Sequence, residues 1–146
     1  MVGRYDRLIR TVGPPVAKNR TGDTHMGERI SVLVVEDETL IRFNVVDALE
    51  DAGYDVFEAA NADDAIAILA VTPSIRLVFT DIDMPGSMDG LKLAAAVRNR
   101  WPPVKIIVTS GHRIVQITDM PDGSVFFSKP YAHLAVLQSM RALLSN

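Results

Sequence analysis

Residues 77–86 have the sequence Leu-Val-Phe-Thr-Asp-Ile-Asp-Met-Pro-Gly, in which an apolar run ends abruptly at a carboxylate. A short apolar or β-branched run between turn signals is typical of a fully buried strand. Pro85 cannot continue a strand ladder and Gly86 favours a turn, so the strand is predicted to end near Asp81. Ligands of open α/β sheets bind at the carboxyl edge, which makes Asp81 a candidate functional residue. Aspartate is also common in ordinary turns, so the rest of the chain must decide between the two roles.

The composition predicts one acidic domain. The chain has 146 residues, 48% of them hydrophobic, which is enough for a core of its own. It has no cysteine, which excludes disulfides, thiol catalysis and cysteine-ligated metals. The net charge is −3, but residues 1–25 carry five basic and two acidic side chains, so the remainder carries −6. This balance argues against nucleic-acid binding by the domain.

Neither a membrane span nor a secretory signal is expected. No apolar run approaches the ~20 residues of a spanning helix, and the N-terminus has no apolar core segment. A cytoplasmic protein is therefore predicted. Residues 1–27 contain several glycines and prolines without sustained periodicity, which predicts a disordered basic extension, with the folded domain at 28–146. A short basic helix within the extension, or a translation start at Met26, are the alternatives.

Apolar segments bounded by turn residues predict five strands. These lie at 30–35, 54–58, 75–80, 104–108 and 124–127. Periodic segments between and after them predict four helices. These lie at 39–52, 61–70, 90–100 and 131–144, and residues 112–120 are weakly helical at best.

Residues at the helix ends support these boundaries. Asn61 and Asp89 are predicted N-caps, and Gly53 is a predicted C′ residue. Leu134, Leu137, Met140 and Leu144 form the predicted apolar stripe of the last helix. Strands alternating with helices through short connections imply a parallel sheet covered on both faces. The expected fold is flavodoxin-like, a doubly wound five-stranded (βα)5 sheet of order 2-1-3-4-5.

This strand order brings polar residues together at one edge of the sheet. Strands 1, 3, 4 and 5 are neighbours, and each ends in a polar group. The groups are, in that order, Glu36 with Asp37, Asp81, Thr109 with Ser110, and Lys129. Clustered carboxylates repel one another unless a cation joins them, and Mg²⁺ prefers oxygen ligands. Together with an amine and a hydroxyl, such a site suits a phosphoryl group that is transferred to Asp81.

With these residues in place, the sequence from about Arg29 to Leu144 resembles a two-component response-regulator receiver domain. The matching segments are Val-Val-Glu-Asp-Glu at 34–38, Phe-Thr-Asp-Ile-Asp-Met-Pro at 79–85, Met-Asp-Gly at 88–90, Val-Thr-Ser-Gly at 108–111 and Ser-Lys-Pro-Tyr at 128–131. The resemblance implies that Asp81 is the phosphoacceptor and Lys129 its cationic partner. It further implies Mg²⁺ ligands at Glu36, Asp37 and Asp81 and at the backbone carbonyl of Asp83. Thr109 and Phe126 would be the switch hydroxyl and the switch aromatic.

The sequence departs from the family pattern in three places. The loop 85–90 is one residue longer than the commonest form, and Ser110 replaces a small apolar residue that is frequent there. Residues 111–123 form a poor helix, so the usual output surface is not assumed.

The resemblance implies phosphoryl transfer from a histidine kinase or histidine phosphotransfer protein. The chain ends at its last predicted helix, so a stand-alone receiver is expected. It would act by relay, as a phosphate sink or through phosphorylation-dependent protein binding, which includes homodimerisation. It is not expected to be an enzyme beyond self-phosphorylation from small phosphodonors and self-dephosphorylation.

Two other functions remain open from the sequence. Asp81 and Asp83 also resemble the Asp-x-Asp of haloacid-dehalogenase-like phosphatases, but that family places the motif after its first strand. The second alternative is a degenerate receiver that serves as an inert interaction module, against which the complete set of site residues argues.

Overall fold

A computed structural model describes residues 29–84, 86, 88–111 and 119–145, and the predicted N-terminal extension lies outside the described residues. The sheet consists of β1 (Ser31–Val35), β2 (Asp55–Ala59), β3 (Ile75–Asp81), β4 (Lys105–Ser110) and β5 (Val125–Ser128). All pairings are parallel, in the order β2-β1-β3-β4-β5. This confirms the predicted doubly wound sheet.

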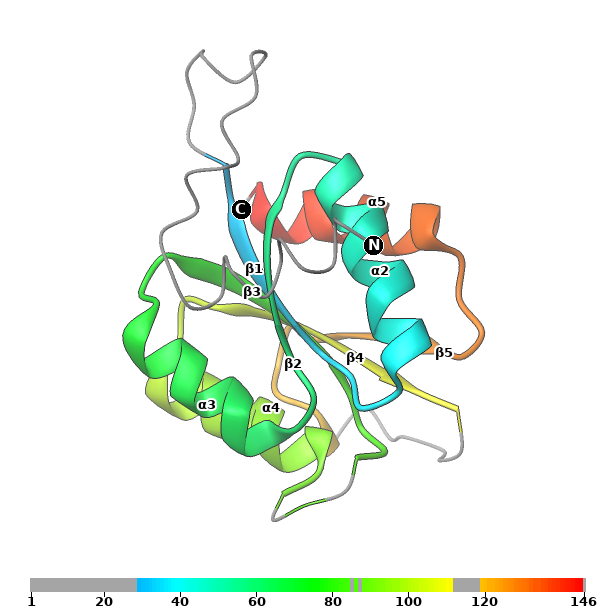
Figure 1. The fold of residues 1–146 in the computed structure, drawn as a ribbon. Helices are drawn as coiled ribbons and strands as arrows, with labels where there is room; N and C mark the ends of the chain where they lie inside the picture. The colour runs from blue at the N-terminus through cyan, green and yellow to red at the C-terminus, as the bar shows by residue number, and fades with distance from the viewer. Residues whose placement is uncertain (1–28, 85, 87, 112–118, 146) are drawn as a thin grey trace.

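In the part of the chain that the structure describes, two pairs of helices cover the sheet (Figure 1). One face carries α2 (Thr39–Asp51) and α5 (His133–Leu144), and the other carries α3 (Ala62–Val71) and α4 (Gly90–Arg100). The central strands β1 and β3 are almost entirely buried, because helices lie on both of their faces. None of the described helices is long and apolar enough to cross a membrane.

Each face of the sheet has its own apolar core. Val78 and Val108 pack with Leu93 and Ala94 on the α3–α4 side. Leu77 and Phe79 pack on the α2–α5 side. Neighbouring strand residues point to opposite faces, so one buried strand supplies both cores.

The predicted caps are confirmed. The Asn61 side chain accepts a hydrogen bond from the backbone N–H of Asp64 at 2.8 Å, and Asp89 accepts one from Lys92 at 3.0 Å. Gly53, which follows the end of α2, has a φ of 101°. These local signals fix where the helices begin and end, and therefore where the strand tips lie.

The predicted stripe of the last helix is wrong at one position. Leu134 is 64% exposed, whereas Val136, Met140 and Leu144 are the buried residues of α5. The helix begins at His133 rather than near Tyr131, so Leu134 stands in its first turn outside the core. Residues 112–118 of the predicted weak helix lie outside the described residues.

Gly90, the first residue of α4, packs directly on the end of β3. A Cβ at this position would lie 2.7 Å from the Cα of Ile82 and would also overlap the backbone carbonyl oxygen of Asp81. The Gly90 N–H also donates to the Ile82 carbonyl at 3.1 Å. Helix α4 therefore holds the backbone on which Asp81 stands.

We predict that Gly90→Ala destabilises the protein by at least about 2 kcal/mol, because the new methyl group meets backbone that cannot yield. Helix propensity alone predicts the opposite sign, a gain of up to about 1 kcal/mol. Urea unfolding measures the difference. Ala95→Gly at an exposed position of the same helix is the control, and it should cost only about 1 kcal/mol. A Gly90→Ala variant as stable as the wild type would contradict the packing described here.

Candidate functional site

The candidate functional residues stand at the carboxyl ends of four adjacent strands. Asp81 ends β3, Glu36 follows β1, and Lys129 follows β5. Backbone bonds fix these tips relative to one another. Asp81 pairs with Thr109 in the register of β3 and β4, and the Ile82 N–H donates to the Thr109 carbonyl at 2.8 Å. The parallel sheet thus brings together residues far apart in the sequence, as predicted.

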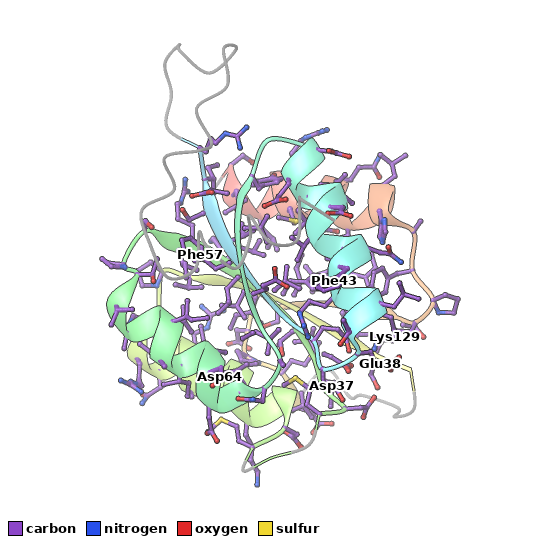
Figure 2. All side chains as sticks on the ribbon, in the orientation of Figure 1. Asp37, Glu38, Phe43, Phe57, Asp64 and Lys129 are labelled. Carbon is purple, nitrogen blue, oxygen red and sulfur yellow. The ribbon has the colours of Figure 1, made fainter. Side chains whose placement is uncertain are left out.

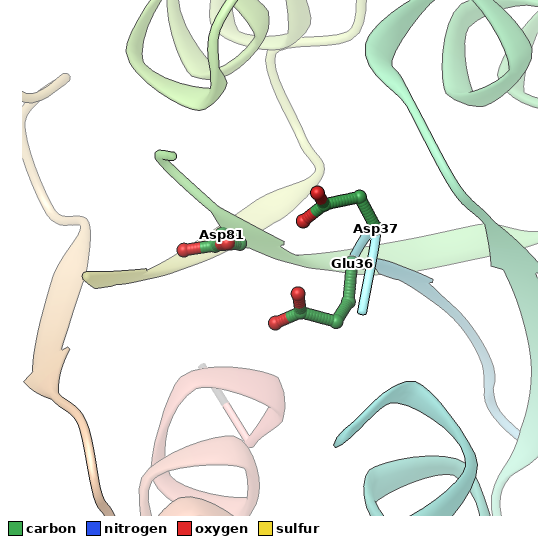
Figure 3. Close-up of side chains that lie close together, drawn as sticks. All are labelled: Glu36, Asp37 and Asp81. Atoms are coloured by element: carbon green, nitrogen blue, oxygen red, sulfur yellow. The ribbon is translucent and has the colours of Figure 1, made fainter. Parts of the chain in front are cut away.

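Three carboxylates meet at this edge. Glu36, Asp37 and Asp81 each place an oxygen within 4.8 Å of the others (Figure 3). Glu36 and Asp81 are each 1% exposed, and Asp37 is half-buried. Burial of several like charges costs free energy unless cations accompany them. These three carboxylates therefore require a nearby positive charge.

Lys129 supplies part of that positive charge. Its Nζ lies 3.0 Å from Glu36 Oε1 and 3.2 Å from Asp81 Oδ2. Figure 2 shows Lys129 and Asp37 at the same edge of the sheet. Gly111 lies against the lysine stem, and a Cβ at this position would make an ordinary van der Waals contact with the Lys129 Cβ at 3.4 Å. The peptide bond between Lys129 and Pro130 is cis.

The electrostatic balance raises the pKa of both buried acids. Burial raises the pKa of Glu36 to about 7, the Asp81 charge adds to this, and the backbone N–H of Glu38 and the ammonium of Lys129 oppose it. Burial also raises the pKa of Asp81, although Lys129 and the backbone N–H of Asp83 pull it down. For Lys129, burial lowers the pKa, but its contacts with Glu36 and Asp81 outweigh this and leave it raised. One ammonium does not neutralise the cluster.

The cluster fits a divalent cation. Asp37 Oδ1 and Asp81 Oδ1 are buried and have no hydrogen-bond partner within the described part of the chain. Three carboxylates against one ammonium leave a formal charge of −2. Carboxylate oxygens are the ligands that Mg²⁺ prefers, usually one or two of them together with waters and phosphate oxygens. Glu36, Asp37 and Asp81 would hold the ion, and the predicted ligand at the Asp83 carbonyl stays a prediction.

Thr109 and Phe126, the two residues predicted to act as a switch, lie on β4 and β5. Thr109 is buried, and its hydroxyl has no hydrogen-bond partner among the described residues. Phe126 is half-buried, faces Val108 in the strand register and packs against the α3–α4 core. A buried hydroxyl next to Asp81 that has no hydrogen-bond partner among these residues is available to bind a ligand. The predicted movement of these side chains stays a prediction.

Ser110 and Asp83 form a contact that the sequence only suggested. The Ser110 hydroxyl donates to Asp83 Oδ2 at 2.8 Å. Asp83 is therefore tied to β4, and its charge adds to the rise in the pKa of Asp81. The serine is one of the three departures from the family pattern, and its effect is to fix an acid near Asp81.

The sequence analysis missed two residues around the site. Arg42 on α2 donates to the Glu36 backbone carbonyl at 2.8 Å and pairs with Glu58 at 3.0 Å. It therefore secures the backbone of Glu36. The Tyr131 hydroxyl is buried without a hydrogen-bond partner in the described residues, and burial together with Glu36 and Asp81 raises its pKa. Arg42 carried no recognisable signal, whereas Tyr131 ends the Ser-Lys-Pro-Tyr segment at 128–131 but was given no role of its own.

The family model described as "Response regulator receiver domain" matches residues 32–140. The chain belongs to this receiver family. A relative that supports the assignment is the response regulator receiver protein CpdR of Brucella abortus (strain 2308), 36% identical over 103 residues, or 68% of this chain and 84% of that protein. A putative response regulator NtrX-like of Rickettsia bellii (strain RML369-C) is 39% identical over 88 residues, 60% of this chain. The receiver spans 18% of that relative's length.

Solved structures of receivers share the fold. The crystal structure of a response regulator receiver protein from Sinorhizobium medicae WSM419 has a TM-score of 0.76 and 26% identity, covering 81% of this chain and 96% of that one. The receiver domain of the hybrid histidine kinase CckA has a TM-score of 0.67 and 28% identity, covering 78% and 98%. In this receiver Asp81 ends the third strand, not the first as in the phosphatase alternative.

We predict that Glu36→Gln stabilises the metal-free receiver at pH 8. Folding raises the Glu36 pKa from 4.5 to about 7, so the free energy of unfolding falls as pH rises through this window. The pKa difference sets an upper bound of about 3 kcal/mol, and a gain of about 1–3 kcal/mol is expected. Urea unfolding with EDTA at pH 5 and pH 8 measures it.

The control for this experiment is Glu38→Gln, which removes the same charge from an exposed side chain two residues away. Little change is expected there. Equal stability of wild type and Glu36→Gln at pH 8 would show that burial of the Glu36 charge carries no cost.

Proposed function

We propose that this receiver is the phosphoacceptor of a two-component or phosphorelay system. Asp81 takes a phosphoryl group from a phosphohistidine on a histidine kinase or histidine phosphotransfer protein. The observation that carries the proposal is the cluster of Glu36, Asp37 and Asp81, the first and last of them buried, together with the Lys129 ammonium. It combines a nucleophile, a candidate cation site and a fixed positive charge, which phosphoryl transfer requires.

The chain's own residues divide the work of the transfer. An Asp81 carboxylate oxygen forms a bond to phosphorus while the bond between phosphorus and the imidazole nitrogen of the donor breaks. Lys129, already 3.2 Å from Asp81, balances the charge of the phosphoryl oxygens. The free Thr109 hydroxyl then donates a hydrogen bond to the new phosphoryl group. Mg²⁺, when bound, supplies the positive charge that lets an anionic group approach the carboxylates.

The proposed output is a change of protein surface rather than turnover of a substrate. Movement of Thr109 toward the phosphoryl group opens space beside β4, and Phe126 turns into it. A difference of a few kcal/mol between the two states is sufficient to shift the population. We propose that the receiver then relays the phosphoryl group or binds a partner. Its own chemistry is limited to self-phosphorylation from small donors and self-dephosphorylation.

Acetyl phosphate with Mg²⁺ tests the acceptor directly. We expect intact-mass spectrometry to show one phosphoryl adduct that disappears with EDTA or in Asp81→Asn. Asp83→Asn is the matched control, because it removes an acid two residues away and should keep the adduct. No adduct on a folded wild-type protein, or an adduct that survives in Asp81→Asn, would reject Asp81 as the acceptor.

The donor protein is expected to dock beside the acid cluster. Leu40 in the first turn of α2 is 70% exposed, and Leu134 in the first turn of α5 is 64% exposed. Both helices begin at the edge of the sheet that carries Lys129 (Figure 2). A cavity of about 390 Å³ lies between these helix starts, lined by Ile41 and Tyr131 among others. Exposed apolar groups next to a reactive site are typical of an interface.

We predict that Leu40→Asp slows phosphoryl transfer from a phosphorylated histidine protein by tenfold or more, about 1.4 kcal/mol. Labelling by acetyl phosphate should stay within about twofold, because the acid cluster is unchanged. Val71→Asp is the control, since Val71 is 79% exposed at the far end of α3. Equal slowing by Val71→Asp, or loss of labelling by acetyl phosphate, would reject a docking role for Leu40.

A further inference from the structure

A second cavity opens at the edge of the sheet opposite the acid cluster. It has a volume of about 530 Å³ and lies where β3 and β4 begin and α3 and α4 end. Ligand sites typically enclose about 300–1,000 Å³. Ile75, at the start of β3, lines the cavity, and Asp81 ends the same strand. At about 3.3 Å per residue, the length of β3 places the cavity roughly 20 Å from the proposed acceptor.

The charge of this cavity is opposite to that of the rest of the molecule. Arg76, Arg100 and Lys105 line it, and no acidic residue is among the described residues of its lining. Within the described ranges, neither Arg100 nor Lys105 forms an ion pair, and Arg76 donates to the Leu144 carbonyl at 3.3 Å. The carboxyl ends of α3 and α4 contribute about −0.5 each, so the cavity keeps a balance of about +2. The whole chain, by contrast, carries −3.

The cavity also has a flat wall. The guanidinium of Arg100 lies 4.5 Å from the centre of the Trp101 ring, and Trp101 itself packs against the α3–α4 core. A guanidinium stacked on an indole is held in a fixed plane, on which a further flat ring can stack. Thr72, the C-cap residue of α3, adds a hydroxyl to the lining.

We propose that this cavity binds a phosphate monoester attached to a flat ring, of the nucleoside monophosphate class. A phosphate monoester carries about −1.5 to −2 at neutral pH, which matches the local balance of about +2. Arg76 and Lys105 hold the phosphate, and the ring stacks on the layer formed by Arg100 and Trp101. The cavity is independent of Asp81, so this assignment does not rest on the proposed phosphoacceptor function.

Trp101 is the single tryptophan of the chain, so its emission reports on this cavity alone. We expect AMP, added to the wild-type receiver, to change the emission saturably with a Kd at or below about 1 mM. Adenosine and inorganic phosphate, used as separate probes, should each bind at least tenfold more weakly, because each offers only half of the recognised chemistry.

Matched variants locate the site. Lys105→Gln and Arg76→Gln should weaken AMP binding about tenfold with unchanged circular dichroism. Lys92→Gln, the same charge change at an exposed position of α4 that does not line the cavity, and Asp81→Asn should bind as the wild type does. No saturable change up to about 10 mM AMP, equal binding of phosphate alone, or equal weakening by Lys92→Gln would each overturn the proposal.

Discussion

The ammonium group of Lys129 is the charge on which the rest of the site depends. It lies between the carboxylates of Glu36 and Asp81, which the fold removes almost completely from water. A buried acid pair without a cation would protonate or force the strands apart. A single ammonium does not balance the three carboxylates, so the site carries an excess of negative charge that a bound cation would neutralise. Burial is the main cause of the raised Glu36 pKa, and the excess of negative charge leaves a set of carboxylates that fits a divalent ion.

The parallel sheet imposes this arrangement at a cost to stability. Asp81 and Thr109 are strand residues in register, so their positions are as rigid as the ladder that holds them. Positions that an ordinary sheet would fill with apolar side chains hold a carboxylate and an unpaired hydroxyl instead. The apolar packing on both faces offsets this cost. Because β3, β4 and β5 are paired neighbours in the sheet, Asp81, Thr109 and Phe126 are held in a fixed register.

Local signals in the sequence made most of the fold predictable, whereas contacts between distant parts of the structure were not predictable. Apolar runs and the caps Asn61 and Asp89 located the helices and strands. The alternation of strands with helices predicted the parallel sheet and its strand order. The predicted burial of Leu134 was wrong. The helix was predicted to begin at residue 131, whereas it begins at His133, which places Leu134 in the first turn. At the site, the acids and Lys129 followed from their places at the strand tips. Arg42 could not be found, because its contact with the Glu36 carbonyl depends on how α2 rests on the sheet.

The glycines of this receiver are required for two different reasons, and this governs how the sequence can vary. Gly53 has open space around it but a φ of 101°, so asparagine, which tolerates the left-handed region, is an acceptable replacement. Gly90 has no such dihedral requirement and is needed only because the backbone of Asp81 and Ile82 fills the space of its Cβ. No other amino acid is small enough, so position 90 can change only if the end of β3 moves as well. In a library of random variants, position 53 should therefore tolerate a second residue type and position 90 none.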